Sequence, residues 1–176
     1  VWSLDSYEDY MSYHGMSAME IYNNSSAMQG YLEHNGKEYD NILRGGERTF
    51  CVATDDNHNK PERPSDSFGG FTMIKAEKLE YRAVGAALAA GHFYASQGPE
   101  IHELWYEDGK LHIACSDAER IVLNTDSRRA QTVYRQKDGT LNGADFDVVP
   151  EDRFVRITVI DASGKCAHTN AYFTDE

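Results

Sequence analysis

Residues 49–58 read Thr-Phe-Cys-Val-Ala-Thr-Asp-Asp-Asn-His, and this stretch decides the fold expected of the chain. Its first five side chains are β-branched, aromatic or small, which is typical of a strand buried on both faces of a parallel sheet. Ligands of such sheets bind at the carboxyl ends of the strands, where the polar residues of this stretch lie. If the backbone stays extended, Asp56 and His58 project to the same side and supply half of a divalent metal site. Imidazole suits Zn or Fe and carboxylate suits Mn or Mg, so the pair does not name the metal.

The composition is that of a folded protein with one ordinary domain or two small ones. The chain has 176 residues, of which 40% are hydrophobic, and a formal charge of −12 from 29 acidic and 17 basic residues. This charge argues against an extended nucleic-acid surface or an anionic membrane surface, because both need a basic footprint. A small anionic substrate held by metal ions is compatible with it.

The cysteines and the apolar runs predict a cytoplasmic protein. Cys51, Cys115 and Cys166 have no metal-type spacing, so we expect reduced core thiols rather than a disulfide framework. The longest apolar run, 83–91, is far short of the roughly 20 residues of a membrane-spanning helix, and no charged-then-apolar leader opens the chain. The chain starts at Val1, and we interpret it as part of a larger protein trimmed at its N-terminus.

The first part of the chain alternates strands and helices up to about Ser96. Strands are expected at 16–22, 49–53 and 71–76, and helices at about 5–14, 24–32, 37–43 and 82–90. Asn23 is expected to cap the helix that follows it. The loop 59–70 follows the central strand and is expected to face the substrate.

The pattern changes period after Gln97-Gly98-Pro99. Seven short strands are expected at 101–106, 111–115, 121–124, 131–134, 146–149, 154–160 and 166–173. Turns at Asp108-Gly109, Asp138-Gly139 and Ser163-Gly164 separate several of them. We therefore expect a partial α/β barrel region at 1–98 and a small antiparallel β-sandwich extension at 99–176.

Three motifs resemble the later part of PHP-domain (polymerase and histidinol phosphatase) metal-dependent hydrolases. They are Thr-Asp-Asp-Asn-His at 54–58, Gly-Gly-Phe-Thr-Met-Ile-Lys-Ala at 69–76 and Ala-Leu-Ala-Ala-Gly-His-Phe-Tyr-Ala-Ser-Gln-Gly-Pro at 87–99. The segment 155–170 is similar to the β-rich extension that some of these proteins carry. The resemblance covers nearly the whole chain, and no single motif would suffice for it.

The resemblance implies the C-terminal half of a distorted (β/α)7 barrel that holds two or three divalent ions, such as Mn, Zn or Fe, in the complete parent protein. Asp56 and His58 match a late Asp and His of the family, which serve as metal ligands and catalytic residues. The earlier ligands, including a His-x-His motif, are absent from this sequence, so the chain is expected to need the N-terminal half of the barrel for activity. The open edges of half a barrel would favour homo-oligomers.

Other polar residues have weaker assignments. Asp55 is expected either to cap backbone donors or to orient a metal ligand through a hydrogen bond, without contacting the metal itself. Asn23 is the other residue that could orient a metal ligand in this way. Glu20 lies in an apolar strand and should have a structural partner, because an unpaired carboxylate there would be costly. His92 and Lys75 are candidate contacts of a substrate phosphate, against the simpler interpretations of helix-dipole compensation and a solvated strand end.

The function expected is that of a fragment of a metal-dependent phosphoesterase, in which metal-activated water attacks a small phosphorylated substrate. Hydrolysis of a carbamate or an amide at the same site is an alternative. A second alternative is non-catalytic, with a binding or structural β-module attached to a degenerate PHP barrel.

Overall fold

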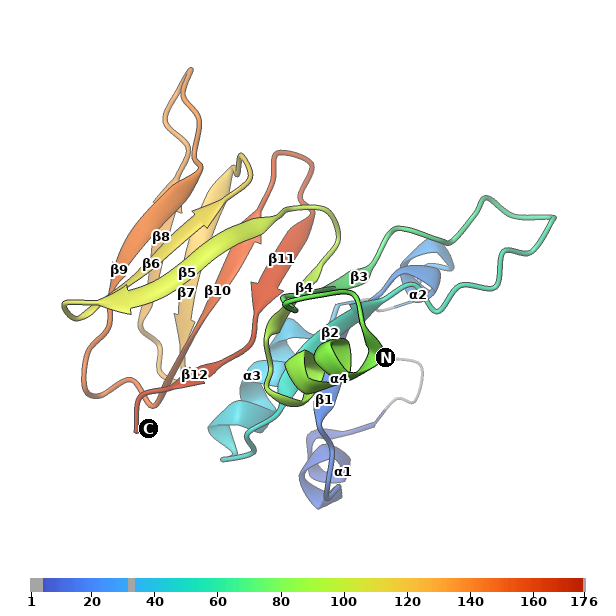
Figure 1. Ribbon diagram of the computed structural model, residues 1–176, viewed down its shortest axis with the longest axis horizontal. Helices are drawn as coiled ribbons and strands as arrows, with labels where there is room; N and C mark the ends of the chain where they lie inside the picture. Colours follow the sequence, from blue (N-terminus) through green and yellow to red (C-terminus); the bar gives the residue numbers. More distant parts are fainter. Residues whose placement is uncertain (1–4, 32–33, 176) are drawn as a thin grey trace. The chain divides into compact units, whose positions relative to one another are not determined.

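The computed structural model describes residues 5–31 and 34–175, and it divides into two compact units (Figure 1). The first unit is formed by residues 1–97 and the second by residues 98–176. The sequence places the boundary one residue later, after residue 98.

The first unit has four short helices and four strands among its described residues. In chain order these are α1 (Tyr7–Ser12), β1 (Ala18–Asn23), α2 (Asn24–Met28), α3 (Gly36–Arg44), β2 (Phe50–Thr54), β3 (Phe71–Ile74), α4 (Tyr81–Ala89) and β4 (Phe93–Ser96). The predicted strands and helices correspond to these elements with shifted ends. β4 is an addition, because the Gly-His-Phe-Tyr-Ala-Ser run was not assigned to a strand.

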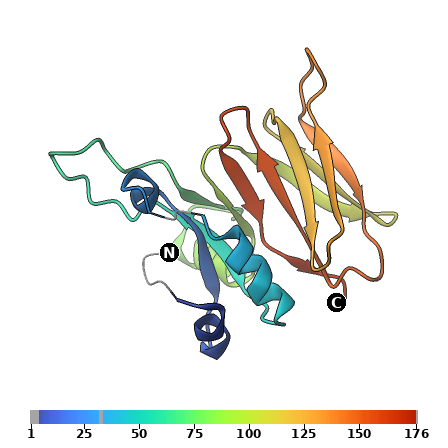
Figure 2. The same ribbon diagram turned by 180° about the vertical axis from the view of Figure 1, so that it is seen from behind.

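β1 and β2 pair in parallel from Ala18 opposite Phe50 to Asn23 opposite Thr54, with a shift of register between Glu20 and Tyr22. Helix α3 lies beside them and buries one apolar stripe formed by Tyr39, Ile42 and Leu43 (Figure 2). The Tyr39 hydroxyl donates to the carbonyl of Thr49, immediately before β2, over 2.9 Å. The buried stripe and this hydrogen bond fix the helix against the two strands.

β3 and β4 form an antiparallel pair whose connection is helix α4. Thr72 of β3 bonds the main chain of β2, because its hydroxyl donates to the Ala53 carbonyl and accepts from the Ala53 N–H. On β4, Phe93 packs edge-on against Phe50, with ring centroids 5.5 Å apart. β3 and β4 therefore cover β2 by side-chain contacts rather than by extending its hydrogen-bonded ladder.

The second unit consists of antiparallel strands. Their bounds are β5 (Ile101–Glu107), β6 (Lys110–Cys115), β7 (Arg120–Thr125), β8 (Ala130–Tyr134), β9 (Gly143–Asp147), β10 (Phe154–Ile160), β11 (Cys166–Thr169) and β12 (Tyr172–Phe173). One sheet has the order β5-β6-β9. In the other, β10 pairs with β7, β11 and β12, and β7 also pairs with β8.

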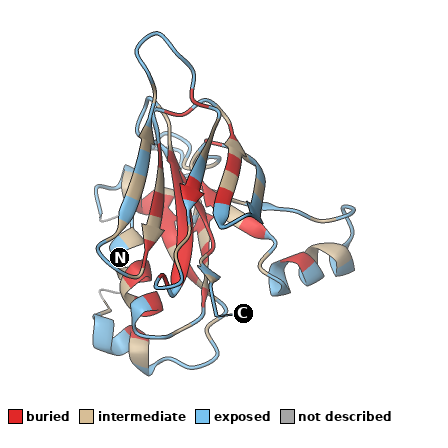
Figure 3. Cartoon of the chain, turned by 90° about the vertical axis from the view of Figure 1, so that its left-hand side faces the viewer, coloured by how far each residue is buried: buried red, intermediate tan, exposed pale blue. Residues whose placement is uncertain are grey.

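Apolar side chains of both sheets form the core of the second unit. Alternate residues of β6 and β7 are buried, among them Ile113 and Leu123, and the central strand β10 is buried along almost its whole length (Figure 3). At the β5–β6 turn, Asp108 and Gly109 both have positive φ, 47° and 78°. Positive φ at both central residues is typical of a type I′ turn, which connects two antiparallel strands. The Asp-Gly pair predicts this turn.

The predicted half of a (β/α)7 barrel is wrong. Among the described residues no strands close into a barrel, and parallel pairing joins only β1 and β2, while the other paired strands within each unit are antiparallel. The chain is richer in strands than the expected alternation of strands and helices. No helix in the described part of the chain is both long and apolar enough to cross a membrane.

Candidate functional site

The candidate site lies at the carboxyl ends of the parallel strands β1 and β2. Neighbouring parallel strands end at the same edge, so Asn23 at the end of β1 lies opposite Thr54 at the end of β2. The chain leaves β2 through the loop 55–70, which returns to β3. Polar side chains from both strands and from this loop gather here.

The side-chain amide of Asn23 connects two carboxylates. Its Nδ2 donates to Glu20 Oε2 over 3.1 Å and to Asp56 Oδ2 over 3.3 Å. Its Oδ1 accepts from the backbone N–H of Ser26 over 2.8 Å, so the same side chain caps helix α2, as predicted. Asn23 is only 6% exposed, which fixes the amide that holds Glu20 and Asp56 near each other.

Glu20 has the structural partners that its place in an apolar strand requires. In addition to Asn23, the hydroxyl of Thr54 donates to Glu20 Oε1. These donors come from β1 and from β2, so the Glu20 carboxylate bridges the ends of the two strands. Glu20 is half-buried, and Asp56 is exposed to solvent.

Asp55 organises the loop rather than the site itself. Its carboxylate accepts three backbone N–H groups, from Phe68 over 2.6 Å, from Gly69 over 2.9 Å and from Gly70 over 2.8 Å. The first residue of the loop is thereby joined to its last three. Of the two predicted roles, Asp55 has that of a cap on backbone donors.

Gly70 at the end of the loop is required by a close main-chain contact, and its neighbour Gly69 lies against the Asn24 side chain. A Cβ on Gly70 would lie 2.5 Å from the Thr54 carbonyl oxygen, and one on Gly69 would lie 2.1 Å from Asn24 Oδ1. Real Cβ atoms do not approach backbone oxygens so closely. Gly70 therefore allows the end of the loop to pass directly over the end of β2.

Asp66 is a second carboxylate that holds the loop. It accepts the backbone N–H groups of His58, over 3.1 Å, and Asn59, over 2.9 Å, and its Oδ2 lies 3.3 Å from the Ser25 hydroxyl. Hydrogen bonds from Asn59 and His58 lower the pKa of the Asp66 carboxyl from its ordinary value, against the opposing effect of burial. The His58 ring is half-exposed, with Nδ1 4.0 Å from Asp66 Oδ2.

The backbone between Asp56 and His58 is not extended. Asp56 has φ +48°, in the left-handed region, so the two-residue periodicity of a strand does not apply to the pair. Asp56 instead contacts Asn23, whereas His58 lies beside Asp66. Their roles as ligands stay a prediction, but the geometric premise that placed them on one side is wrong.

Lys75 and His92 are neighbours at another place in the first unit. The Lys75 N–H donates to the His92 carbonyl over 2.8 Å, which continues the pairing of β3 with β4. Lys75 follows the last residue of β3 and His92 precedes the first residue of β4, whereas Gly70, which contacts the end of β2, precedes the first residue of β3. The structure brings Lys75 and His92 together. They lie at the end of β3, whereas the loop 55–70 joins its beginning.

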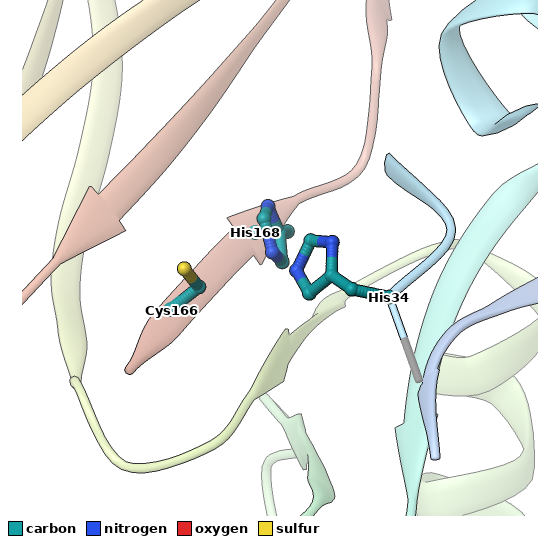
Figure 4. A group of neighbouring side chains, drawn as sticks. All are labelled: His34, Cys166 and His168. Atoms are coloured by element: carbon teal, nitrogen blue, oxygen red, sulfur yellow. The ribbon is translucent and has the colours of Figure 1, made fainter. Parts of the chain in front are cut away.

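Cys166 and His168 lie two positions apart on β11, so their side chains leave the same face of the strand (Figure 4). Thiolate and imidazole are donors that could hold a metal ion together with further ligands. His34, also drawn in Figure 4, belongs to the first unit, whereas Cys166 and His168 belong to the second. We therefore assign no site to the three residues together.

Sequence reasoning missed Thr54 and Asp66. Thr54 looks like the last residue of an ordinary strand, and Asp66 lies in a Pro- and Ser-containing loop without periodicity. Comparisons of the chain with protein-family models, with curated proteins and with solved structures find no match.

Proposed function

We propose that the chain is a metal-dependent hydrolase that cleaves a phosphoester, with Glu20 and Asp56 as metal ligands. The observation that carries the proposal is the Asn23 amide, which holds both carboxylates within hydrogen-bond distance of one nitrogen atom. The resemblance of residues 54–58 to PHP-domain hydrolases supports Asp56, together with His58, as a metal ligand, and it does not extend to Glu20. A divalent ion bound there would supply reactive water and would stabilise charge on the phosphoryl oxygens.

The donor set fits a hard divalent cation. Carboxylate oxygens suit Mg or Mn, and such ions commonly keep several water ligands, so two protein carboxylates can be enough to bind one. Asn23 is the residue that positions them, since its Oδ1 is occupied by the Ser26 N–H. His58, two residues after Asp56, is the side chain that could add an imidazole ligand and favour Mn, Zn or Fe.

Two exposed cations of the loop support a phosphorylated substrate, in a loop that also carries four carboxylates. Lys60 and Arg63 are exposed on the loop whose backbone is held by Asp55 and Asp66. Cations on a loop beside a metal site attract phosphate groups in a chain that is otherwise acidic. Carbamate or amide hydrolysis at the same site is the alternative chemistry, because the attacking water is common to all three.

A non-catalytic function is the competing proposal, and a different observation favours it. The carboxylates of Asp55 and Asp66 both accept backbone N–H groups, which is a structural task. If Glu20 and Asp56 have only this kind of task, the strand-end cluster stabilises a loop that binds a partner.

Manganese binding followed by electron paramagnetic resonance distinguishes the two proposals. We expect the intact chain to bind Mn²⁺ saturably, Asp56→Asn and Glu20→Gln to bind at least tenfold more weakly, and Glu77→Gln to bind as the parent does. Glu77 is an exposed carboxylate of the same unit outside the cluster. Turnover of bis(p-nitrophenyl) phosphate in Mn²⁺ is then measured on the same four proteins.

The outcomes separate metal binding from catalysis. Turnover that is lost in Asp56→Asn but retained in Glu77→Gln supports the hydrolase. Saturable metal binding without turnover of phosphoester, carbamate or amide substrates contradicts the hydrolase and supports the non-catalytic function. Equal Mn²⁺ affinity in the parent and in Asp56→Asn contradicts the site itself.

A further inference from the structure

Between the two sheets of the second unit lies a cavity of about 540 Å³ that has no part in the proposed hydrolase. This volume lies in the range of small-molecule sites, roughly 300–1,000 Å³. One side of its wall is formed by β5 and the start of β6, and the other side by the start of β10 and by β12. The connection between β9 and β10 completes the wall.

The strand register shows which side chains face the space between the sheets. Leu104 and Tyr106 lie two positions apart on β5, and Tyr106 lies directly opposite Leu111 of β6, so these three side chains share one face. In the other sheet, Val155 of β10 lies directly opposite Tyr172 of β12. All five residues line the cavity.

The cavity reaches from the apolar core of the unit to its surface. Leu111 and Val155 are only 5% and 4% exposed, so part of the wall consists of core side chains. Tyr106 and Tyr172 are 63% and 44% exposed, so another part is accessible from solvent. A ligand that enters past the tyrosines would therefore contact side chains of the core.

The wall offers little to a charged or strongly polar ligand. None of the described residues that line the cavity is charged. Trp105 contributes to the wall, but its indole leaves the opposite face of β5 and stacks there on His112. The hydroxyl of Thr174, another lining residue, donates to the Asp152 carbonyl. An ion that entered would lose hydration without meeting an opposite charge, which is costly.

We infer that this cavity, lined by Leu104, Tyr106, Leu111, Val155 and Tyr172, binds a small uncharged apolar molecule of the class of medium-chain alcohols and alkylbenzenes. The transfer of hydrocarbon from water to an apolar wall supplies the binding free energy. The same wall selects against charged molecules of equal chain length, because it cannot replace the water that hydrates their head groups.

The probe for this site is 1-octanol, and its matched controls are octanoate and octylammonium, which carry opposite charges on a chain of the same length. Each is titrated into the full chain at pH 7 and followed by the methyl NMR signals of Leu111 and Val155. We expect submillimolar affinity for 1-octanol and at least tenfold weaker binding of both ions. Octylammonium is the stricter control, because the chain has a formal charge of −12 and attracts cations in general.

A variant that fills the cavity tests its location. Val149 is a half-buried lining residue, and Val149→Trp should weaken 1-octanol binding at least tenfold, because the larger side chain occupies the space. Tyr134→Trp, at an exposed position of β8 outside the cavity, should bind as the parent does. Circular dichroism verifies that each variant is folded. If Val149→Trp is not, Tyr106→Ala replaces it and should weaken binding about fivefold through the loss of its ring.

Four results would overturn the inference. The first is an affinity for octylammonium equal to that for 1-octanol, and the second is no saturable shift of the Leu111 and Val155 signals up to the solubility of 1-octanol. The third is unchanged affinity in the folded variant. The fourth is a shift of the same signals with protein concentration in the absence of 1-octanol, which would indicate that a second copy of the chain occupies the cavity.

Discussion

The carboxylate of Asp55 lies 2.8 Å from the backbone nitrogen of Gly70, so the two ends of a loop of fifteen sequence steps meet at one side chain. Phe68 and Gly69 donate to the same carboxylate. A hydrogen bond to a charged acceptor stabilises the folded state by about 1.5–3 kcal/mol, which is more than a hydrogen bond between neutral groups contributes. The contributions of three bonds to one carboxylate are not additive. The Asp55 carboxylate therefore contributes to the stability of the loop, together with Asp66.

Replacing Asp55 by Ala should open the loop. We expect the free energy of unfolding to fall by about 2–3 kcal/mol, because three backbone donors lose their acceptor at once. Chemical denaturation measures the loss, and hydrogen exchange of the Phe68, Gly69 and Gly70 amides should accelerate. Glu62→Ala, an exposed acid of the same loop, is the control and should change stability by less than about 0.5 kcal/mol. An unchanged rate of hydrogen exchange at the Gly70 amide would contradict this role of the Asp55 carboxylate.

Two glycine-to-alanine substitutions should have opposite effects. At Gly70 the new Cβ would meet the Thr54 carbonyl at 2.5 Å, and we expect a loss of about 2 kcal/mol. At Gly85, inside α4, nothing lies within 4 Å of the new Cβ, and we expect a gain of about 0.5–1 kcal/mol from helix propensity. Thermal unfolding of both variants gives the comparison. A stable Gly70→Ala protein would mean that the loop does not pass over β2.

The Asp66 carboxyl should make stability depend on pH in the acid range. Its pKa is lower in the folded chain than the ordinary value of 3.8, because the N–H groups of Asn59 and His58 donate to it. The folded state thus binds this proton less tightly than the unfolded state, and the stabilisation is present above the unfolded pKa and is lost as the pH falls through the folded pKa. The stability difference between the parent and Asp66→Asn should be constant from pH 5 to 7 and should shrink below about pH 4. A difference that grows on acidification would contradict the assignment.

The Cys115 thiol should resist modification in the folded chain. Burial, and secondarily the charge of Asp117, raise its pKa to about 11, and only 3% of the residue is exposed. At pH 8 about one thiol in a thousand is then ionised. We expect Ellman's reagent to label Cys115 only after unfolding in urea, with mass spectrometry of peptides to identify the labelled cysteine. Labelling of Cys115 in native buffer within minutes would show that β6 is not buried as described.

Local features were predictable from the sequence where one residue type has one physical role. Asn23 was predicted as a helix cap, and its side chain accepts the Ser26 N–H. The Asp108-Gly109 turn was likewise predictable, because both residues tolerate the positive φ that the turn needs. The strands of the second unit follow from alternation and turn signals.

Long-range features were not predictable in the same way. The barrel was wrong because a strand buried like β2 can be covered by Thr72 and Phe93 as well as by further parallel strands, and the local pattern is the same. The extended backbone assumed for Asp56 failed because Asp tolerates the left-handed region. Asp66 contacts Ser25 across 41 positions, and no local signal indicates which carboxylate of a polar loop will do so.

Helix α3 holds β1 and β2 in place through hydrogen bonds to their main chains. A parallel ladder of two strands is marginal by itself, yet Asn35 at the start of the helix bonds the Glu20 carbonyl over 3.1 Å, and Tyr39 bonds Thr49. Fraying of this helix would let β1 and β2 slide past each other and would scatter Glu20 and Asp56. The positions of Glu20 and Asp56 thus depend on the packing of α3 against β1 and β2, and substitutions along its buried stripe should disturb the carboxylate pair without changing either carboxylate.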